Sequence, residues 1–525
     1  MKINPPISSK SSYAWIGETI TNTSYDPLYK VQPGELGFDP LRYYKLLPKN
    51  LDISSKLYKD AFISEVNPSL SAHTWEQAPK ASVDSVKIDL VMKQWGNVID
   101  FNKVNLTYSF VYVDNIGSNS GVTYIGAGAY KDERVIFFNY NLAAQSGGFD
   151  MKNLSLGTWA GAIALHEIGH GLGLNHSYEP APQVRDFRFT VMDYAARVGV
   201  DIDPSVKIPL TPGMKDIADL QAPSKFGESH AQDGNTTYKF SQTTADLGHG
   251  NLLAGVTGAD LKNYVMTIFD RAGSAGGNDT IDASAFNNTQ NLYIDLRAGH
   301  FSAIGTLGTS AAIAPTGADL NGDGDPDGDT NYNVGIAVGA QIENAKGGSG
   351  DDILTGNDQA NILEGNAGKD KLIGGKGADT LKGGDNDDTL DGGKDGAIDI
   401  LEGGTGFDTY LIHAGEHETI TDSDGKGQIR YIASDGKTIN IILGAFVQVG
   451  TTNEWKHTLA DGSIVSFTHN SPWKLTMPDG SIIELGETFN DGDFGINLVQ
   501  NTPTNTPTSR NIFGDLVPFG KVWRT

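Results

Sequence analysis

Residues 166–176 read HEIGHGLGLNH, and this stretch decides the fold of the region around it. His166 and His170 are four positions apart, so on a helix they share one face with Cβ atoms about 5–6 Å apart, which suits two imidazoles on one metal ion. If the helix continued, His176 would lie roughly 15 Å along the axis from His166, far beyond a Zn–N bond. The chain must therefore turn, and we expect the turn at Gly173, because glycine accepts the left-handed conformation that ends helices.

Three histidines and a glutamate in this order predict a zinc site. We expect His166, His170 and His176 to bind Zn²⁺ and Glu167, adjacent to the metal, to act as general base. The alternative is a helix whose histidines recur without a metal, which a chain with 11 histidines in 525 residues would rarely produce.

The histidine pattern resembles the metzincin signature, in which a methionine turn follows the third histidine. Val191-Met192-Asp193-Tyr194 fits that turn. The resemblance implies that Met192 supports the zinc site from below. It also implies that Tyr194 ligates zinc at rest and hydrogen-bonds the oxyanion during catalysis.

A nine-residue repeat begins at Gly347 and reads GGSGDDILT, GNDQANILE, GNAGKDKLI, GGKGADTLK and GGDNDDTLD. This Gly-Gly-x-Gly-x-Asp-x-apolar-x pattern predicts a calcium-binding parallel β-roll of the RTX type, because glycines allow tight turns and aspartates supply hard oxygen ligands. The expected ligands are Gly348, Gly350, Asp352, Gly365, Asn366, Gly368, Asp370, Gly374, Gly375, Gly377, Asp379, Gly383, Gly384, Asp388, Asp399 and Asp408. The residues expected to point inward are Ile353, Leu372, Leu381, Leu390 and Leu401. A disordered acidic linker is the alternative, but it does not explain this recurring apolar residue.

Two irregularities interrupt the repeat. Asn361 replaces the aspartate of the second repeat, so we expect that turn to bind calcium less strongly. Two extra residues precede Asp399, and we expect them to disturb the repeat there. Without calcium the whole array is expected to be disordered, because its carboxylates repel one another.

Together the two signatures resemble the serralysin family, secreted zinc metalloproteases with a metzincin domain and an RTX β-roll. Leu210–Gln221 is similar to the family's helix after the methionine turn, and residues 276–282 are similar to its first calcium turn, which adds Gly276 and Asp279 to the calcium ligands. The resemblance covers roughly residues 80–411. It implies protein substrates, export by a type I secretion apparatus, and an edge strand at 135–141 that pairs with an extended peptide.

The composition limits the classes of function. A formal charge of −25 disfavours partners such as nucleic acid and favours calcium. The sequence contains no run of 18 apolar residues, so we expect no membrane-spanning helix. We also expect a monomer. The chain has no cysteine, and its N-terminus lacks the apolar core of a cleavable signal, which agrees with signal-free export to the extracellular space; a cytoplasmic location is the alternative.

The predicted fold is an α+β metzincin catalytic domain followed by an all-β parallel β-roll and an additional C-terminal β-hairpin domain. The expected boundaries are an N-terminal arm or pro-segment at 1–70, the protease at 71–235, a β-rich transition at 236–346, the β-roll at 347–411, the hairpin domain at 412–500, and a linker and tail at 501–525. Within them we expect a helix over 83–98, a strand over 106–113, and hairpins at the Asp-Gly pairs starting at 424, 435, 461 and 479. Residues 319–329 fit a calcium loop and a solvated acidic loop equally well.

These features predict an extracellular zinc endopeptidase. The alternative is an RTX adhesion or toxin-like binding protein whose protease domain is inactive or only processes the chain; the intact Glu167 argues against an inactive enzyme. An RTX lipase is a weaker alternative, because the chain has no Gly-x-Ser-x-Gly nucleophile motif.

Overall fold

The computed structural model describes most of the chain from Ser85 onward. The described residues are 85–99, 107–113, 121–126, 133–139, 154–175, 187–192, 207–221, 234–241, 261–270, 277–286, 290–306, 332–434, 444–459, 461–486 and 489–500, with short strand segments at 14–16, 44–46, 197–198, 201–202, 245–246, 438–440, 509–510 and 516–517.

The first sheet has five strands in the order β1-β4-β5-β3-β2. These strands are β1 (Ala14–Ile16), β2 (Tyr44–Leu46), β3 (Thr107–Val113), β4 (Gly121–Gly126) and β5 (Glu133–Asn139). The strand expected at 106–113 is confirmed as β3. The strand expected near 135 is confirmed as β5, but its predicted edge position is wrong. β5 lies between β3, with which it runs parallel, and β4, which folds back on it as an antiparallel partner.

Three helices accompany this sheet: α2 (Ser85–Gly96), α4 (Trp159–Gly171) and α5 (Met214–Gln221). The helix expected over 83–98 is confirmed as α2, whose residues Ile88, Val91, Met92 and Trp95 are fully buried at helical spacing. The Trp95 indole N–H donates to the Leu165 carbonyl at 3.2 Å and so ties α2 to α4.

A four-stranded sheet, in the order β14-β15-β11-β8, follows the helical region. Its strands are β8 (Ile208–Pro209), β11 (Tyr264–Ile268), β14 (Phe301–Ser302) and β15 (Val334–Ile336). β8 directly precedes α5, and Phe301 of β14 packs with Met214 at the start of α5. The Phe301 ring also lies 5.4 Å from Phe189, so this sheet supports the segment that leads into Met192.

Two parallel sheets form the β-roll. One carries β12 (Thr280–Asp282), β16 (Asn344–Lys346), β18 (Ile362–Ala367), β20 (Thr380–Asp385), β22 (Ile398–Thr405) and β24 (His417–Thr421). The other carries six parallel strands, β13 (Tyr293–Asp295), β17 (Ile353–Thr355), β19 (Lys371–Gly375), β21 (Thr389–Gly393), β23 (Asp408–His413) and β25 (Gly427–Ile432). The chain alternates between the two sheets, so each coil contains two repeats. The parallel pairing extends beyond the predicted bounds of the roll: it begins before Gly347 and continues after Leu411.

The apolar residues of the repeats stack inside the roll. Leu354, Leu372 and Leu390 pair in register, as do Leu363, Leu381 and Leu401, and all six are fully buried. The predicted inward position of Ile353 is wrong by one residue, because Leu354 holds the register of the later leucines. The two extra residues before Asp399 do not break the register either: Leu381 still pairs with Leu401, and the extra length lies between β21 and β22.

Antiparallel strands follow the roll. They are β26 (Thr438–Asn440), β27 (Gly444–Gln448), β28 (Glu454–Thr458), β29 (Ile464–His469), β30 (Trp473–Thr476), β31 (Ile482–Leu485) and, pairing in parallel with β27, β32 (Ile496–Val499). The hairpins expected at Asp461 and Asp479 are confirmed. The hairpin expected at Asp424 is wrong, because this turn connects β24 and β25 of the two roll sheets. The strands on either side of the Asp435 pair, β25 and β26, are antiparallel partners, as the expected hairpin requires, while Asp435 itself lies outside the described residues.

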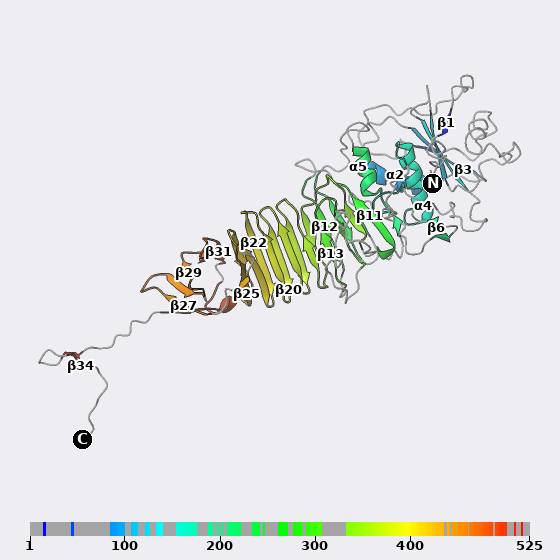
Figure 1. Cartoon of the computed structure of the whole chain (residues 1–525). Helices are drawn as coiled ribbons and strands as arrows, with labels where there is room; N and C mark the ends of the chain where they lie inside the picture. Colours follow the sequence, from blue (N-terminus) through cyan, green and yellow to red (C-terminus); the bar gives the residue numbers. More distant parts are fainter. Residues whose placement is uncertain are drawn as a thin grey trace, which may run out of the picture.

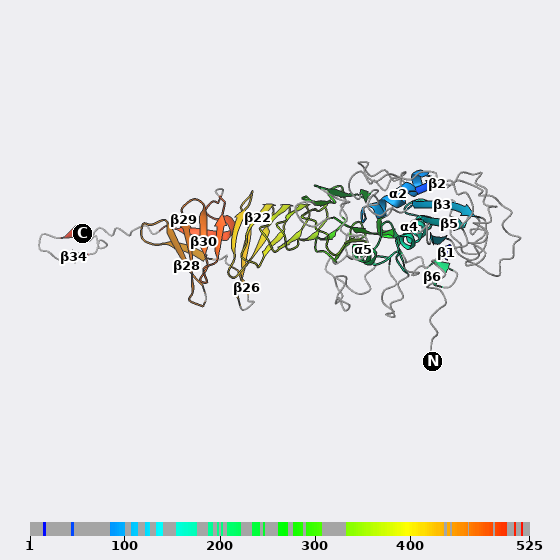
Figure 2. The same cartoon turned by 90° about the horizontal axis from the view of Figure 1, so that it is seen from above.

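The molecule is elongated (Figures 1 and 2), with the helices at one end, the stacked strands of the roll in the middle and β27–β31 beyond them. β31 returns to the roll and pairs in parallel with β24, the last roll strand of its sheet. Among the residues that the structure describes, no helix is long and apolar enough to cross a membrane.

Candidate active site and calcium sites

The helix α4 carries the candidate zinc ligands and ends where the sequence predicts. Thr158 caps its start by accepting a hydrogen bond from the Gly161 N–H at 3.1 Å. At its other end Gly173 has φ +88°, and the N–H groups of Gly173 and Leu174 donate to the carbonyls of His170 and Gly169. These two hydrogen bonds and the left-handed glycine are typical of a glycine C-cap, which ends the helix and reverses the direction of the chain. The expected turn at Gly173 is therefore confirmed.

The two described histidines of the motif lie side by side on α4. Their ring centroids are 4.6 Å apart, with an angle of 89° between the ring planes. His166 Nδ1 lies 2.8 Å from the Val191 carbonyl, and His170 Nδ1 lies 2.9 Å from the Leu174 carbonyl. A carbonyl can only accept, so both Nδ1 atoms carry the proton and both Nε2 atoms carry a lone pair.

Burial lowers the pKa of His166 to about 4, although its hydrogen bond to Val191 acts in the opposite direction. The imidazole is therefore neutral near pH 7, which is the form that binds a metal ion. Because both Nδ1 atoms face carbonyl oxygens, the neutral form of each ring carries its lone pair on Nε2, which fits a zinc ion held by Nε2 atoms.

Glu167 lies between the two histidines in sequence and is buried. The Thr123 hydroxyl, on β4, lies 2.7 Å from Glu167 Oε2 and 2.8 Å from the Glu167 carbonyl. Burial raises the pKa of Glu167 to about 7, while the hydrogen bond from Thr123 lowers it. A carboxyl group with a pKa near 7 is suited to accept a proton and return it at neutral pH.

Met192 lies directly beneath α4. A side chain at Gly169 would meet the Met192 sulfur at 2.6 Å, so the glycine between the two histidines leaves room for the methionine. Met192 is 1% exposed. Its packing supports the structural role that the sequence predicts.

Asp216, a residue that the sequence analysis did not single out, holds the segment before Met192. Its carboxylate is 1% exposed and accepts hydrogen bonds from the Thr190 hydroxyl at 2.5 Å, the Val191 N–H at 2.7 Å and the Gly213 N–H at 2.9 Å. The carbonyl of the same residue, Val191, lies 2.8 Å from His166 Nδ1. Asp216 therefore positions His166 through the backbone of a single residue.

Several expected site residues lie outside the part of the chain that the structure describes. They are His176, Tyr194, Gly276 and the acidic loop at 319–329. The described part brings together two of the three expected imidazoles, the general base and Met192.

The aspartates of the roll form two ladders along its two edges. On one edge the backbone N–H of each aspartate donates to the carboxylate of the next, at 2.7–2.9 Å, through Asp352, Asp370, Asp388 and Asp408. On the other edge the ladder runs from Asn361 to Asp379 and Asp399 at 2.7–2.8 Å. Asp399 keeps its place in the ladder, so the expectation that the preceding insertion disturbs this turn is wrong.

The ladders leave one oxygen of several carboxylates without a partner. Asp370, Asp379, Asp388 and Asp408 are at most 2% exposed, and the Oδ2 atom of each accepts no hydrogen bond from the residues that the structure describes. Burial raises their pKa values, to about 9 for Asp370 and about 8 for Asp388. Burial makes the charged form of these carboxyl groups unfavourable on its own, and a hard cation would stabilise it, so the donor set fits calcium.

The glycines of the repeats bring backbone close to these oxygens. A side chain at Gly374 would meet Asp379 Oδ2 at 2.2 Å and the Gly392 carbonyl at 2.5 Å, and Gly365 and Gly383 are equally crowded. Gly375, Gly377 and Gly384 have φ between +103° and +121°, which glycine adopts without strain. Asp279 lies earlier, with its Oδ2 likewise unpartnered, and accepts from the Thr236 N–H at 2.6 Å.

Glu418 was missed by the sequence analysis because it lies beyond the last repeat. Its register partner is Asp399, and its carboxylate accepts from the Asp399 N–H at 3.2 Å, so it continues the ladder in place of an aspartate. It is 1% exposed, and burial raises its pKa to about 9. A parallel-strand register continuing past the repeat was the only signal that could have found it.

Comparison with known proteins agrees with this order of parts. Residues 65–177 match a family model described as metallo-peptidase family M12B, reprolysin-like. Residues 229–325 match the peptidase M10 serralysin C-terminal model. The model of the RTX calcium-binding nonapeptide repeat matches residues 339–372, 346–381 and 364–396.

The chain is also similar to curated bacterial proteins. A serralysin of Photorhabdus luminescens is 31% identical over 297 residues, which cover 52% of each protein. Serralysin C of Dickeya chrysanthemi is 31% identical over 262 residues, 47% of this chain and 43% of that protein. The metalloprotease AprA of Pseudomonas entomophila is 35% identical over 223 residues, 39% of this chain and 38% of that protein.

The chain thus spans about half the length, or less, of the curated relatives it matches. The matched regions include a metzincin-like protease region, which implies a metal ion, and RTX repeats, which imply calcium binding. In sequence and in the order of its parts, the chain is therefore serralysin-like, with a metallopeptidase region followed by RTX calcium-binding repeats.

Proposed function

We propose that this chain is a secreted zinc endopeptidase that cleaves proteins and whose β-roll folds with calcium. The observation that carries the proposal is the pair of buried imidazoles on α4, 4.6 Å apart and each with Nδ1 at a backbone carbonyl, with Glu167 between them in sequence. The proposed zinc ligands are His166, His170 and His176, and Tyr194 is proposed as a further ligand at rest. The similarity to serralysins supports this assignment.

In the proposed mechanism the protein groups have separate tasks. Glu167 accepts a proton from the attacking water and passes it to the leaving amine, which its pKa of about 7 favours. The Thr123 hydroxyl fixes one oxygen of this carboxylate. Tyr194 donates a hydrogen bond to the oxyanion that forms at the scissile carbonyl.

A bound zinc ion supplies Lewis acidity to the scissile carbonyl and lowers the pKa of water to about 7. The Val191 and Leu174 carbonyls would fix the ring orientations of the two imidazoles that hold the metal. The Asp216 carboxylate holds the backbone of Val191, and Met192 packs beneath α4.

The proposed location is extracellular, with export by a type I secretion apparatus. Calcium outside cells reaches the millimolar concentrations that weak carboxylate-and-carbonyl sites need. The buried, unpartnered oxygens of Asp370, Asp379 and Asp388 support a roll that is stable only where calcium is abundant.

Glu167→Gln in the full-length, calcium-loaded protein tests the proposed function. The variant should retain its zinc and its thermal stability but lose casein hydrolysis by about 10²–10⁴-fold, because only the base is removed. Glu454→Gln is the matched control: this glutamate is on β28, pairs with Lys456 at 3.1 Å and should leave hydrolysis unchanged.

Two results would contradict the proposal. A Glu167→Gln variant with wild-type hydrolysis would remove Glu167 from the reaction. Wild-type protein that binds zinc and calcium yet cleaves no protein substrate would instead favour an RTX binding protein with an inactive protease fold.

A further inference from the structure

Asn361 occupies the ladder position that aspartates hold in later coils, but its carboxamide is bonded differently. Its Nδ2 donates to the Glu343 carbonyl at 2.8 Å and to Asn357 Oδ1 at 3.2 Å. Its Oδ1 accepts from the Asn357 N–H at 2.7 Å. Both amide hydrogens and the amide oxygen of this side chain, which is 1% exposed, are therefore satisfied by protein atoms.

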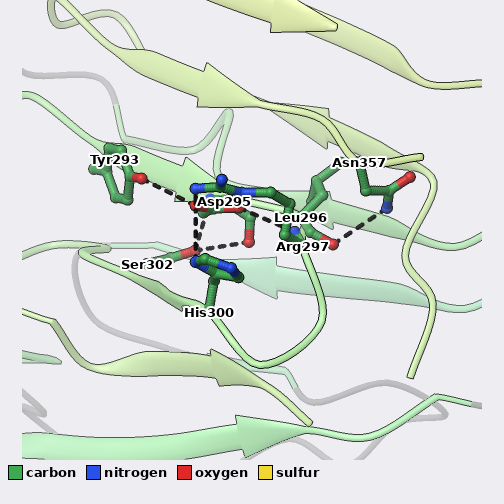
Figure 3. Close-up of polar contacts among 7 residues, drawn as sticks. All are labelled: Tyr293, Asp295, Leu296, Arg297, His300, Ser302 and Asn357. Carbon is green, nitrogen blue, oxygen red and sulfur yellow. Dashed lines mark hydrogen bonds and ion pairs between the residues drawn. The ribbon is translucent and has the colours of Figure 1, made fainter. Parts of the chain in front are cut away.

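Asn357 continues this network toward the preceding strands. Its Nδ2 donates to the Ile342 carbonyl at 2.7 Å and to the Leu296 carbonyl at 3.2 Å, and its Oδ1 accepts from the Gln359 N–H at 2.9 Å. Figure 3 shows the Asn357 amide reaching the Leu296 carbonyl from the neighbouring coil. The two side chains thus bind three backbone carbonyls that belong to earlier turns of the chain.

The strand that provides the Leu296 carbonyl is itself held without a metal. Asp295, at 1% exposure, accepts hydrogen bonds from Arg297 Nη2 at 2.5 Å, the Tyr293 hydroxyl at 3.0 Å and the Arg297 N–H at 3.0 Å (Figure 3). The Ser302 hydroxyl accepts from the Asp295 N–H at 2.9 Å. The Leu296 carbonyl that Asn357 binds is therefore presented by a segment whose neighbouring carboxylate is paired within the protein.

Asp379, the next ladder residue on the same edge, is not fully hydrogen-bonded in this way. Asp379 accepts the Asn361 N–H at 2.7 Å with Oδ1, but its buried Oδ2 has no partner. A buried anionic oxygen without a partner is strongly unfavourable until a cation binds it. A neutral carboxamide carries no such cost, and its two N–H groups take the place of a cation in binding carbonyl oxygens.

We propose that Asn357 and Asn361 close the turn that leads into β18, the first turn of the nonapeptide repeats on this edge of the roll, without calcium. Strands β16 and β18 then pair before calcium is bound, and this pair is the template on which the calcium-dependent coils assemble. The inference rests on the proposed calcium binding by the later coils, and it assigns to the first turn a role opposite to theirs.

Hydrogen exchange of the full-length wild-type protein in excess chelator tests the template. The amides of β16 and the first residues of β18, which pair through Asn344–Ile362 to Lys346–Glu364, should be protected at least 10-fold more than those of β20 and β22. Millimolar calcium should then protect all four strands. Equal, fast exchange of all four strands in chelator would overturn the proposal.

Asn361→Asp tests the side chain itself. The new carboxylate should remove the protection of β16 and β18 in chelator, restore it in millimolar calcium and add one bound calcium per chain, counted by equilibrium dialysis. Asn453→Asp, at an exposed position between β27 and β28, makes the same charge change and should alter neither exchange nor calcium count. An Asn361→Asp protein with wild-type protection in chelator would also overturn the proposal.

Asn361→Ala keeps the test decisive should the aspartate variant fail to fold. Loss of the amide should abolish the protection of β16 and β18 in chelator while leaving the calcium count unchanged, and retained protection would contradict the closure. The chelator experiments need no bound ion. A wild-type protein that binds no calcium at any turn would therefore refute the proposed calcium roll, while exchange in chelator would still decide the closure.

Discussion

Thr123 and Glu167 are 44 positions apart in the chain, yet the Thr123 hydroxyl lies 2.7 Å from Glu167 Oε2. Thr123 belongs to β4, the strand that packs beside α4, and both residues are buried. The sheet therefore fixes the orientation of the Glu167 carboxylate. The Thr123 hydroxyl stabilises the charged form of this proposed general base.

Thr123→Val should lower casein hydrolysis about 10-fold without loss of zinc. The substitution keeps the shape of the side chain but removes a hydrogen bond to a charged group, which contributes about 1.5 kcal/mol or more. Steady-state kinetics and elemental analysis measure the two quantities. Thr458→Val on β28 is the control, and unchanged kinetics in Thr123→Val would show that the hydroxyl does not hold the base.

Asp216→Ala should lower the free energy of unfolding of the protease region by about 3 kcal/mol, because buried N–H and hydroxyl groups lose their acceptor. The loosened Val191 peptide should also weaken zinc retention during dialysis. Scanning calorimetry and elemental analysis measure these effects. The control is Asp219→Ala on the same helix, where an exposed pair with Lys215 at 3.1 Å contributes at most a few tenths of a kcal/mol. Equal destabilisation by both substitutions would contradict the role of Asp216.

Without calcium, the roll should lose stability as the pH rises. The pKa values of Asp388, Asp370 and Glu418 in the folded roll, about 8, 9 and 9, lie above their ordinary values of 3.8, 3.8 and 4.5. The folded state therefore binds more protons, so this stability is present below about pH 4 and is lost as the pH rises through 8 to 9.

Circular dichroism of the full chain in chelator should show a strand signal that decreases between pH 5 and pH 9. In millimolar calcium the same signal should stay nearly constant, because the cation replaces the protons. A strand signal in chelator that increases with pH would contradict the assignment of these buried carboxylates.

Glu418→Gln should have opposite effects with and without calcium. In chelator near pH 7 the neutral amide should increase the protection of β22 and β24 from hydrogen exchange, since folding no longer requires the residue at 418 to take up a proton. In calcium it should raise the concentration needed to protect β24, because a ligand charge is lost. Glu402→Gln, at an exposed position 3.8 Å from Lys382, is the control. A calcium midpoint identical to the wild type would exclude Glu418 from the binding ladder.

The sequence predicts the elements whose physics is local. The turn at Gly173 follows from the reach of a helix, and the stacked leucines follow from a period of nine residues. The internal position of β5 could not be read from its own residues, because an internal strand and an edge strand have the same alternation and differ only in their neighbours. Asp216 and Thr123 were missed for the same reason: their partners are contributed by distant segments, and an isolated aspartate or threonine carries no motif.

In the roll, the nine-residue repeat predicts some ladder residues but not others. A repeat of nine residues predicts the ladder of aspartates up to Asp408, but Glu418 continues the ladder after the repeat has ended. Asn361 marks a weaker calcium turn by its chemistry alone. That its amide binds the Glu343 carbonyl becomes visible only when the coils are stacked, because 18 positions separate the two residues.

β31 pairs with β24 and so closes one end of the stack of coils. A stack of parallel coils ends in an open row of N–H and C=O groups, which would accept the corresponding row of a second molecule. β31 occupies that row on the sheet that contains β24. Phe494 packs against Tyr410 of β23, on the other sheet, at a distance of 5.7 Å between ring centroids. The C-terminal strands therefore cover the end of the stack at β24, so that row of backbone groups is not open to a second roll.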